Sequence, residues 1–370
     1  MSEVSSKHVE ADWNASLTAV GARGFLGALT RELHHDRLLY LIVATYAAAA
    51  LAVGHWLSVG SRIDLLTYMS TWVLSISAAS MLYILLVELP AAIRSDPVAP
   101  LSALRLRLAR YVTPRTLASL SLILALGLFM GVFTSMKTML PFITEFSWDQ
   151  RFAELDAAIH GGVDPWRLLH PALAQPIANR IVEFCYAGIW MMLTCGAAAW
   201  AAGSATMAPY RVRFLTCFML AWILLGNLMA GAFFSAGPAF FEAVGGGGRY
   251  AELVAYHAAQ PQSPTSAHAL QEWLWAEHQA GLMQIGTGIS AFPSMHVSMA
   301  TMTVIAAFCT HRKLGYFALG YLVLILASSV HLGWHYAVDG YASILGTLTL
   351  WYGLGAAPRV WRAAQRLRPS

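Results

Sequence analysis

Charged side chains are scarce in this sequence. Only 11% of its 370 residues are Asp, Glu, Lys or Arg, whereas about a quarter are charged in an ordinary soluble domain. Cysteine is also rare, and its four copies have neither zinc-site nor disulfide-framework spacing. The low charge content argues against a soluble protein. A net charge of +4, spread between apolar segments, gives no indication of nucleic-acid binding.

The sequence is instead rich in apolar residues. Apolar residues make up 58% of the chain and recur in stretches of about 20, each long enough to cross about 30 Å of hydrocarbon as a helix. The sequence therefore predicts an all-α fold, a polytopic transmembrane helix bundle of about eight spans. The sixth and seventh spans are short. The expected spans lie near residues 38–60, 64–88, 116–140, 180–202, 213–235, 294–310, 314–331 and 336–356.

Basic residues between the predicted spans are distributed unequally across the membrane. Of the 23 Lys and Arg residues, most fall in the N-terminal segment, alternate loops and the tail, which all lie on one side. The positive-inside rule then predicts that both termini are cytoplasmic. The composition, rich in Ala and Arg, favours the inner membrane of a bacterium, with the other face toward the periplasm or outside.

This topology divides the chain into five predicted segments. A cytoplasmic N-terminal segment precedes a three-span bundle, an outer interfacial segment, a membrane core that carries the chemistry, and a basic cytoplasmic tail. In order, these are residues 1–37, 38–140, 141–178, 179–357 and 358–370.

Two predicted outer segments contain helical patterns of their own. Phe152, Leu155 and Ile159 recur at helical spacing and indicate either an amphipathic helix at the membrane interface or a helix that caps the bundle. The second segment, 236–293, is expected to contain another interfacial helix around residues 270–275. A connection of this length in a compact bundle is often functional.

Ionisable residues are costly at membrane depth, so those near the span ends are candidates for function. Ser294, after Pro293, is expected to be the N-cap of an apolar helix, with His296 in its first turn. A helix start offers unpaired amides to an anion. Two spans later the chain returns to the same face, where His335 and Asp339 are spaced i, i+4 on one helix. The sequence thus predicts that these groups converge at one surface.

Two histidines, a carboxylate and an anion-binding helix start suit phosphoryl transfer. A neutral imidazole can attack phosphorus and form a phosphohistidine, which divides one difficult displacement into two easier steps. A carboxylate at the other ring nitrogen fixes the tautomer and orientation of that imidazole. A second, protonated histidine can donate a proton to the departing oxygen.

The motifs around these residues resemble those of the type 2 phosphatidic acid phosphatase superfamily, and more closely its branch of inositol phosphorylceramide synthases (inositolphosphotransferases). Pro293–His296 matches the PSGH motif with Met in place of Gly. Ser328, His335 and Asp339 match the SRxxxxxHxxxD motif, whose arginine position is occupied by Ser329. The resemblance covers spans four to eight, roughly half of the chain.

The resemblance implies a role for each matched residue. His335 would be the nucleophile, Asp339 its orienting partner and His296 the general acid. Ser294 and nearby amides would hold the phosphate. No cofactor and no metal is expected.

The basic residues of the family motifs are missing. The KxxxxxxRP motif is replaced by Phe234–Pro238, which resembles a variant of the inositolphosphotransferase branch. This loss favours a phosphodiester lipid, which carries one charge fewer than a phosphomonoester, and hence transfer of a phospho-headgroup. Further predicted substrate-binding residues are Gly237, Arg249 and His331, the last in place of the arginine charge; Lys137 is another possible source of charge.

The predicted function is that of a lipid phosphotransferase or phosphatase that acts in the bilayer on a lipid-linked phosphate. The sequence does not choose between water and a headgroup alcohol as acceptor, nor does it give the oligomeric state. Two alternatives stay open. One is a proton-coupled transporter that uses the His/Asp cluster as a relay, and the other is a metal site formed by His331, His335 and Asp339.

Overall fold

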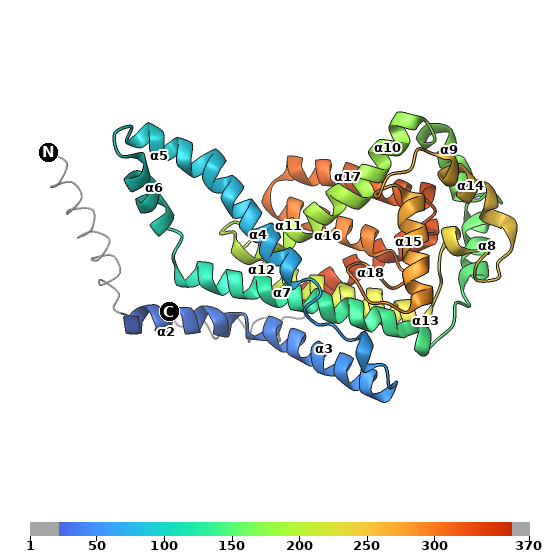
Figure 1. Cartoon of the computed structure of the whole chain (residues 1–370), viewed down its shortest axis with the longest axis horizontal. Coiled ribbons are helices and arrows are strands. Elements are labelled where there is room, and N and C mark those ends of the chain that lie inside the picture. Colours follow the sequence, from blue (N-terminus) through green and yellow to red (C-terminus); the bar gives the residue numbers. More distant parts are fainter. Residues whose placement is uncertain (1–21, 357–370) are drawn as a thin grey trace. The chain divides into compact units, whose positions relative to one another are not determined.

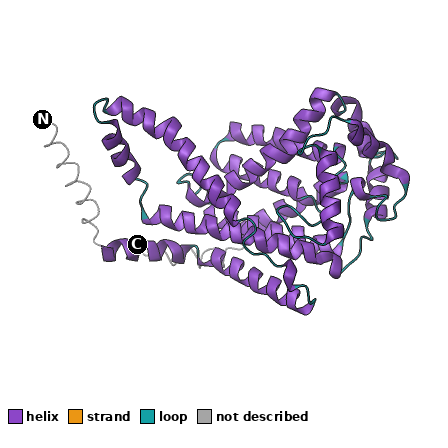
Figure 2. Ribbon diagram, viewed as in Figure 1, coloured by secondary structure: helices purple, strands orange, loops and turns teal. Residues whose placement is uncertain are grey.

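The computed structural model describes residues 22–356, which form helices and loops without a strand (Figure 2). The predicted all-α class is therefore confirmed. Within this described range, six helices are long and apolar enough to cross a membrane, as expected of an integral membrane protein. They are Arg37–Trp56, Met69–Ser95, Pro114–Phe142, Pro176–Gly203, Arg211–Ala232 and Arg312–His331. The predicted tail, 358–370, and most of the predicted N-terminal segment, 1–37, lie outside the described residues.

The other two predicted spans are helices of a different character. Helix α16 (Met295–Thr310) has 16 residues, a length of about 24 Å at 1.5 Å per residue, which is shorter than the hydrocarbon core. Helix α18 (Ala337–Ala356) has 20 residues, but glycine, hydroxyl and tyrosine side chains lower its hydropathy. The predicted count of eight spans is therefore approximate.

The chain forms two compact units, which are described separately. The first comprises residues 22–43 and 68–128. Within it, the buried carboxylate of Glu88 accepts hydrogen bonds from Arg107 Nε at 2.6 Å and from Tyr111 Oη at 2.7 Å. Its helices are α2 (Ala22–His35), the start of α3 (Arg37–Trp56), α4 (Met69–Tyr83), π-helix η2 (Ile84–Glu88), α5 (Leu89–Ser95), α6 (Pro100–Ala109) and the first part of α7 (Pro114–Met139).

The second unit comprises residues 44–67 and 129–356. Helix α16 is at its centre and packs against α11, α17 and α18 (Figure 1). Besides the ends of α3 and α7 and several short 3-10 helices, the unit contains α8 (Asp149–Ile159), α9 (Pro165–Leu173), α10 (Pro176–Phe184), π-helix η4 (Cys185–Ile189), α11 (Trp190–Gly203), α12 (Arg211–Leu220), π-helix η5 (Ala221–Met229), α13 (Ala230–Ala232), α14 (Ala251–Ala259), α15 (Ala267–Ala280) and α17 (Arg312–His331).

Small residues allow the central helices to approach closely. A Cβ atom at Gly340 of α18 would lie 2.2 Å from the Leu326 side chain of α17. Ser298 of α16 and Thr347 of α18 share a hydrogen bond of 2.7 Å. Small and hydroxyl side chains are typical of helix contacts inside membranes, where close backbone packing replaces the hydrophobic effect.

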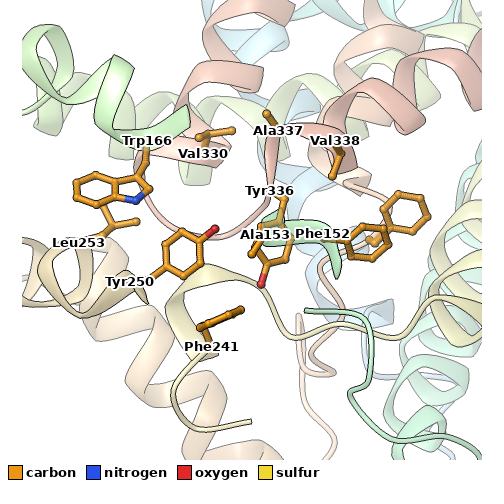
Figure 3. Close-up of a cluster of buried hydrophobic side chains, with 11 residues drawn as sticks. Phe152, Ala153, Trp166, Phe241, Tyr250, Leu253, Val330, Tyr336, Ala337 and Val338 are labelled. Atoms are coloured by element: carbon orange, nitrogen blue, oxygen red, sulfur yellow. The ribbon is translucent and has the colours of Figure 1, made fainter. Parts of the chain in front are cut away.

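Helix α8 caps this unit and does not present one apolar stripe. Phe152 is buried, whereas Leu155 and Ile159 are about half exposed, at 48% and 52%. Phe152 belongs to a buried hydrophobic cluster around Tyr336, the residue just before α18 (Figure 3). Phe152 therefore anchors the helix to the unit, while Leu155 and Ile159 remain accessible.

The buried face of α8 carries two carboxylates that hold loops of the unit. Asp149 accepts hydrogen bonds from the backbone N–H groups of Ala236 and Gly237, both at 2.8 Å, and from Tyr336 Oη at 2.8 Å. Asp156 accepts from the backbone N–H groups of residues 337 and 338 at 2.7 and 2.9 Å. Because these are the first residues of α18, Asp156 satisfies amides that the helix itself cannot pair.

We expect Asp156→Asn to lower the thermal unfolding midpoint of the detergent-purified protein. The two carboxylate oxygens accept from two different N–H groups, and the amide keeps only one acceptor oxygen. A buried N–H without a partner costs about 1–3 kcal/mol. The matched control is Glu154→Gln, an exposed position on the same helix, which should leave the midpoint unchanged. Equal midpoints for the two variants would contradict this role of Asp156.

Candidate active site

The ring of His335 is held through one of its two nitrogens. His335 lies in the loop between α17 and α18, and its Nδ1 atom is 2.7 Å from the backbone oxygen of Ala291 and 3.3 Å from Asp339 Oδ2. A carbonyl oxygen can only accept, so the hydrogen-bond network assigns the proton to Nδ1. The lone pair of a neutral ring then lies on Nε2, which has no partner among the described residues.

The surroundings of His335 favour the neutral imidazole. Burial lowers the pKa of His335 to about 3, the positive charge of Lys137 adds to this effect, and the hydrogen bond to Ala291 opposes it. A histidine with a lowered pKa is uncharged at neutral pH. The neutral ring is the nucleophilic form.

Asp339 connects the loop that carries His335 with the start of α16, which carries His296. Its buried Oδ2 atom faces His335 and accepts the backbone N–H of Tyr336 at 3.0 Å. Its own backbone oxygen accepts from the N–H of Ser294 at 3.3 Å and from Ser343 Oγ at 2.6 Å. The predicted orienting partner is therefore also a structural link between the start of α16 and the start of α18.

His296 lies in the first turn of α16, and two aromatic rings fix its plane. Its imidazole stacks on Tyr186 with ring centroids 4.0 Å apart and packs against Trp190 at 3.9 Å. Trp190 Nε1 also donates to the backbone oxygen of His296 at 2.9 Å. The centroids of His296 and His335 are 6.2 Å apart. The structure thus brings the predicted His/His/Asp set together.

Tyr186 and Trp190 come from the junction of π-helix η4 with α11. The sequence reasoning overlooked both, although their i, i+4 spacing places them on one helix face. The Tyr186 hydroxyl is buried and has no hydrogen-bond partner in the described part of the chain.

Ser294 is the N-cap of α16, as predicted. Its Oγ atom accepts the backbone N–H of Val297 at 3.4 Å, and the residue is fully buried. Its contact with a phosphate stays a prediction.

The segment that replaces the family's basic motif, Phe234–Pro238, contacts both the loop of His335 and the residues just before α16. Ser235 accepts the N–H of Ala291 at 2.8 Å through its backbone oxygen, and that of Phe292 at 3.2 Å through its side chain. Gly237 has a φ of +96°, and a Cβ atom there would lie 2.6 Å from the backbone oxygen of Trp334. Gly237 therefore permits a close approach to the loop that carries His335.

Two of the predicted substrate-binding residues are engaged elsewhere. Arg249 Nη2 binds Asp164 at 2.5 Å and the backbone oxygen of Ala153 at 3.0 Å. His331 Nε2 donates a hydrogen bond to Asn179 Oδ1 at 3.1 Å. The His331 ring lies beside two other imidazoles, those of His170 and His257, at centroid distances of 5.5 and 5.3 Å.

The alternative of a metal site finds no geometric support between residues 22 and 356. No group of three or more His, Cys, Asp or Glu side chains there is arranged to hold a metal ion. The side chain of His331, one of the three proposed ligands, points instead into the cluster with His170 and His257.

Comparison with known proteins gives one match. A profile described as the PAP2 superfamily, the type 2 phosphatidic acid phosphatases, matches residues 150–353. Searches of curated proteins and of solved structures find no match. The matched region covers more than half of the chain and includes His296, His335 and Asp339. On this evidence the chain belongs to the PAP2 superfamily.

Proposed function

We propose that this chain is a lipid phosphotransferase or phosphatase that acts within the membrane on a lipid-linked phosphate, through a phosphohistidine at His335. The observation that carries this proposal is the arrangement around His335. Its Nδ1–H is held by Ala291 and Asp339, and its Nε2 lone pair has no partner within residues 22–356. Membership of the PAP2 superfamily supports the same class of reaction.

The proposed reaction has two displacement steps. In the first, Nε2 of His335 attacks phosphorus, the bond from phosphorus to the leaving oxygen breaks, and protonated His296 donates its proton to that oxygen. In the second, an alcohol or water attacks phosphorus, His296 takes its proton, and the P–N bond breaks. Asp339 stabilises the charge that develops on the His335 ring. An anionic substrate beside His296 would favour its protonated form.

The preferred substrate in this proposal is a phosphodiester lipid, and the preferred reaction is transfer of its phospho-headgroup to an alcohol, as in the inositolphosphotransferase branch. The missing family lysine and arginine support this preference, and so does the engagement of Arg249 with Asp164. Hydrolysis to free phosphate is the second candidate. We further propose that the site faces the periplasm of a bacterial inner membrane, with both termini in the cytoplasm.

The roles of the two histidines can be separated by the leaving group. For a phosphodiester with an alkyl leaving group, we expect both His335→Ala and His296→Ala to lower kcat/KM by about 100-fold or more. A nitrophenyl leaving group departs without a proton. With such a substrate, the kcat/KM of His296→Ala should return close to that of wild type, whereas that of His335→Ala should stay low. The measurement is release of alcohol or nitrophenol by purified protein, with exposed His55→Ala as control. If His296→Ala lowers kcat/KM by the same factor for both substrates, the role of His296 as the acid is refuted.

The acceptor can be identified from the products. Purified wild-type protein in mixed micelles should convert labelled phosphodiester lipids, given a panel of headgroup alcohols, into new phospholipids, and His335→Ala should not. Because the reaction passes through a P–N bond, rapid quenching should trap acid-labile label on wild-type protein. Free phosphate as the sole product would make the chain a phosphatase. Turnover unaffected by His335→Ala, or substrate-dependent proton flux in liposomes without turnover, would favour the transporter alternative.

A further inference from the structure

The proposed site lacks the positive charge that its family motifs usually provide, and Lys137 is placed to supply it. Lys137 lies in the last turn of α7, within the same compact unit as the two histidines. It is partly buried. Among residues 22–356 it has no carboxylate, carbonyl or hydroxyl partner, in contrast to Arg249, whose charge is balanced by Asp164. An unpaired ammonium near the end of a membrane helix is costly and is a functional candidate for that reason.

The stem of Lys137 packs against Gly288, in the segment that precedes α16. A Cβ atom at Gly288 would lie 2.9 Å from Cγ of Lys137 and 3.3 Å from its Cβ and Cδ atoms. Gly288 has a φ of +92° and stands three residues before Ala291, whose carbonyl holds His335. A glycine at this position therefore leaves room for the lysine beside the segment that leads to both histidines.

The ammonium group of Lys137 interacts electrostatically with both histidines of the site. The charge of Lys137 acts on the imidazoles of both His296 and His335. The two rings are 6.2 Å apart, so a cation that acts on both is suited to an anion bound between them.

We infer that Lys137 binds the non-bridging oxygens of the substrate phosphate and replaces the absent motif residues. This inference rests on the proposed function and narrows its substrate class. A lysine is a single point charge, which balances the one negative charge of a phosphodiester and leaves a dianionic phosphomonoester half neutralised. Lys137 lies before the region that the superfamily profile matches, residues 150–353. The binding charge would thus come from a helix outside the recognised part of the chain.

The test uses the full-length protein with bis(p-nitrophenyl) phosphate as the probe. We expect Lys137→Met, which keeps an apolar stem and removes the charge, to lower kcat/KM by about 10- to 100-fold, mostly through KM. Lys137→Arg should recover activity to within about tenfold of wild type. Competitive inhibition by inorganic phosphate should weaken in Lys137→Met by a similar factor. The control is Lys313→Met, an exposed lysine at the start of α17, which should change none of these values.

The outcomes separate this inference from the proposed function. If wild type turns over the probe, requires His335, and Lys137→Met retains wild-type kcat/KM, the role of Lys137 is refuted while the phosphohistidine mechanism stands. If Lys137→Arg is as inactive as Lys137→Met with an unchanged unfolding midpoint, a role as a positive charge is also refuted. If wild-type turnover does not depend on His335, the proposed function itself fails.

Discussion

Backbone amides in non-helical segments at membrane depth need hydrogen-bond partners within the protein, because the hydrocarbon core offers no water. The second unit meets this requirement with two aspartates on α8. Asp149 holds the amides of residues 236 and 237, and Asp156 holds those that open α18. The loops that they fix contact the loop of His335 and the segment before α16. The positions of His335 and Asp339 therefore depend on two carboxylates that take no part in the proposed chemistry.

Local patterns in the sequence predicted the parts of this arrangement that depend on local rules. Apolar runs gave the helices, and Ser294 gave an N-cap. The expectation that His335 and Asp339 share one helix was wrong, because α18 begins at Ala337 and His335 lies in the loop before it. The two side chains still lie within 3.3 Å of each other. The two-span separation brought His296 to the same site. The span count was less accurate. Helix α16 is short, and small and polar side chains lower the mean hydropathy of α18. Both features serve close helix packing, which a count based on hydropathy does not detect.

Tertiary contacts decided what the sequence could not show. Arg249 looked like a phosphate ligand until the structure paired it with Asp164, 85 residues away. His331 shares a helical face with His335 only if the helix continues, but α17 ends at His331 and the chain turns before α18. Lys137 and the α8 aspartates lie far from the motifs along the chain. Their importance follows from what they face in the folded protein.

The π-helix η4 also determines which side chains of η4 and α11 face His296. Cys185–Ile189 is wound more widely than an α-helix, and such a turn accommodates one extra residue. One residue corresponds to about 100° of rotation in an α-helix. The widened turn therefore sets the angular register between α10 and α11, and with it the alignment of Tyr186 and Trp190 on the imidazole. The length of that segment, and not only its composition, therefore helps to determine the geometry of the candidate active site.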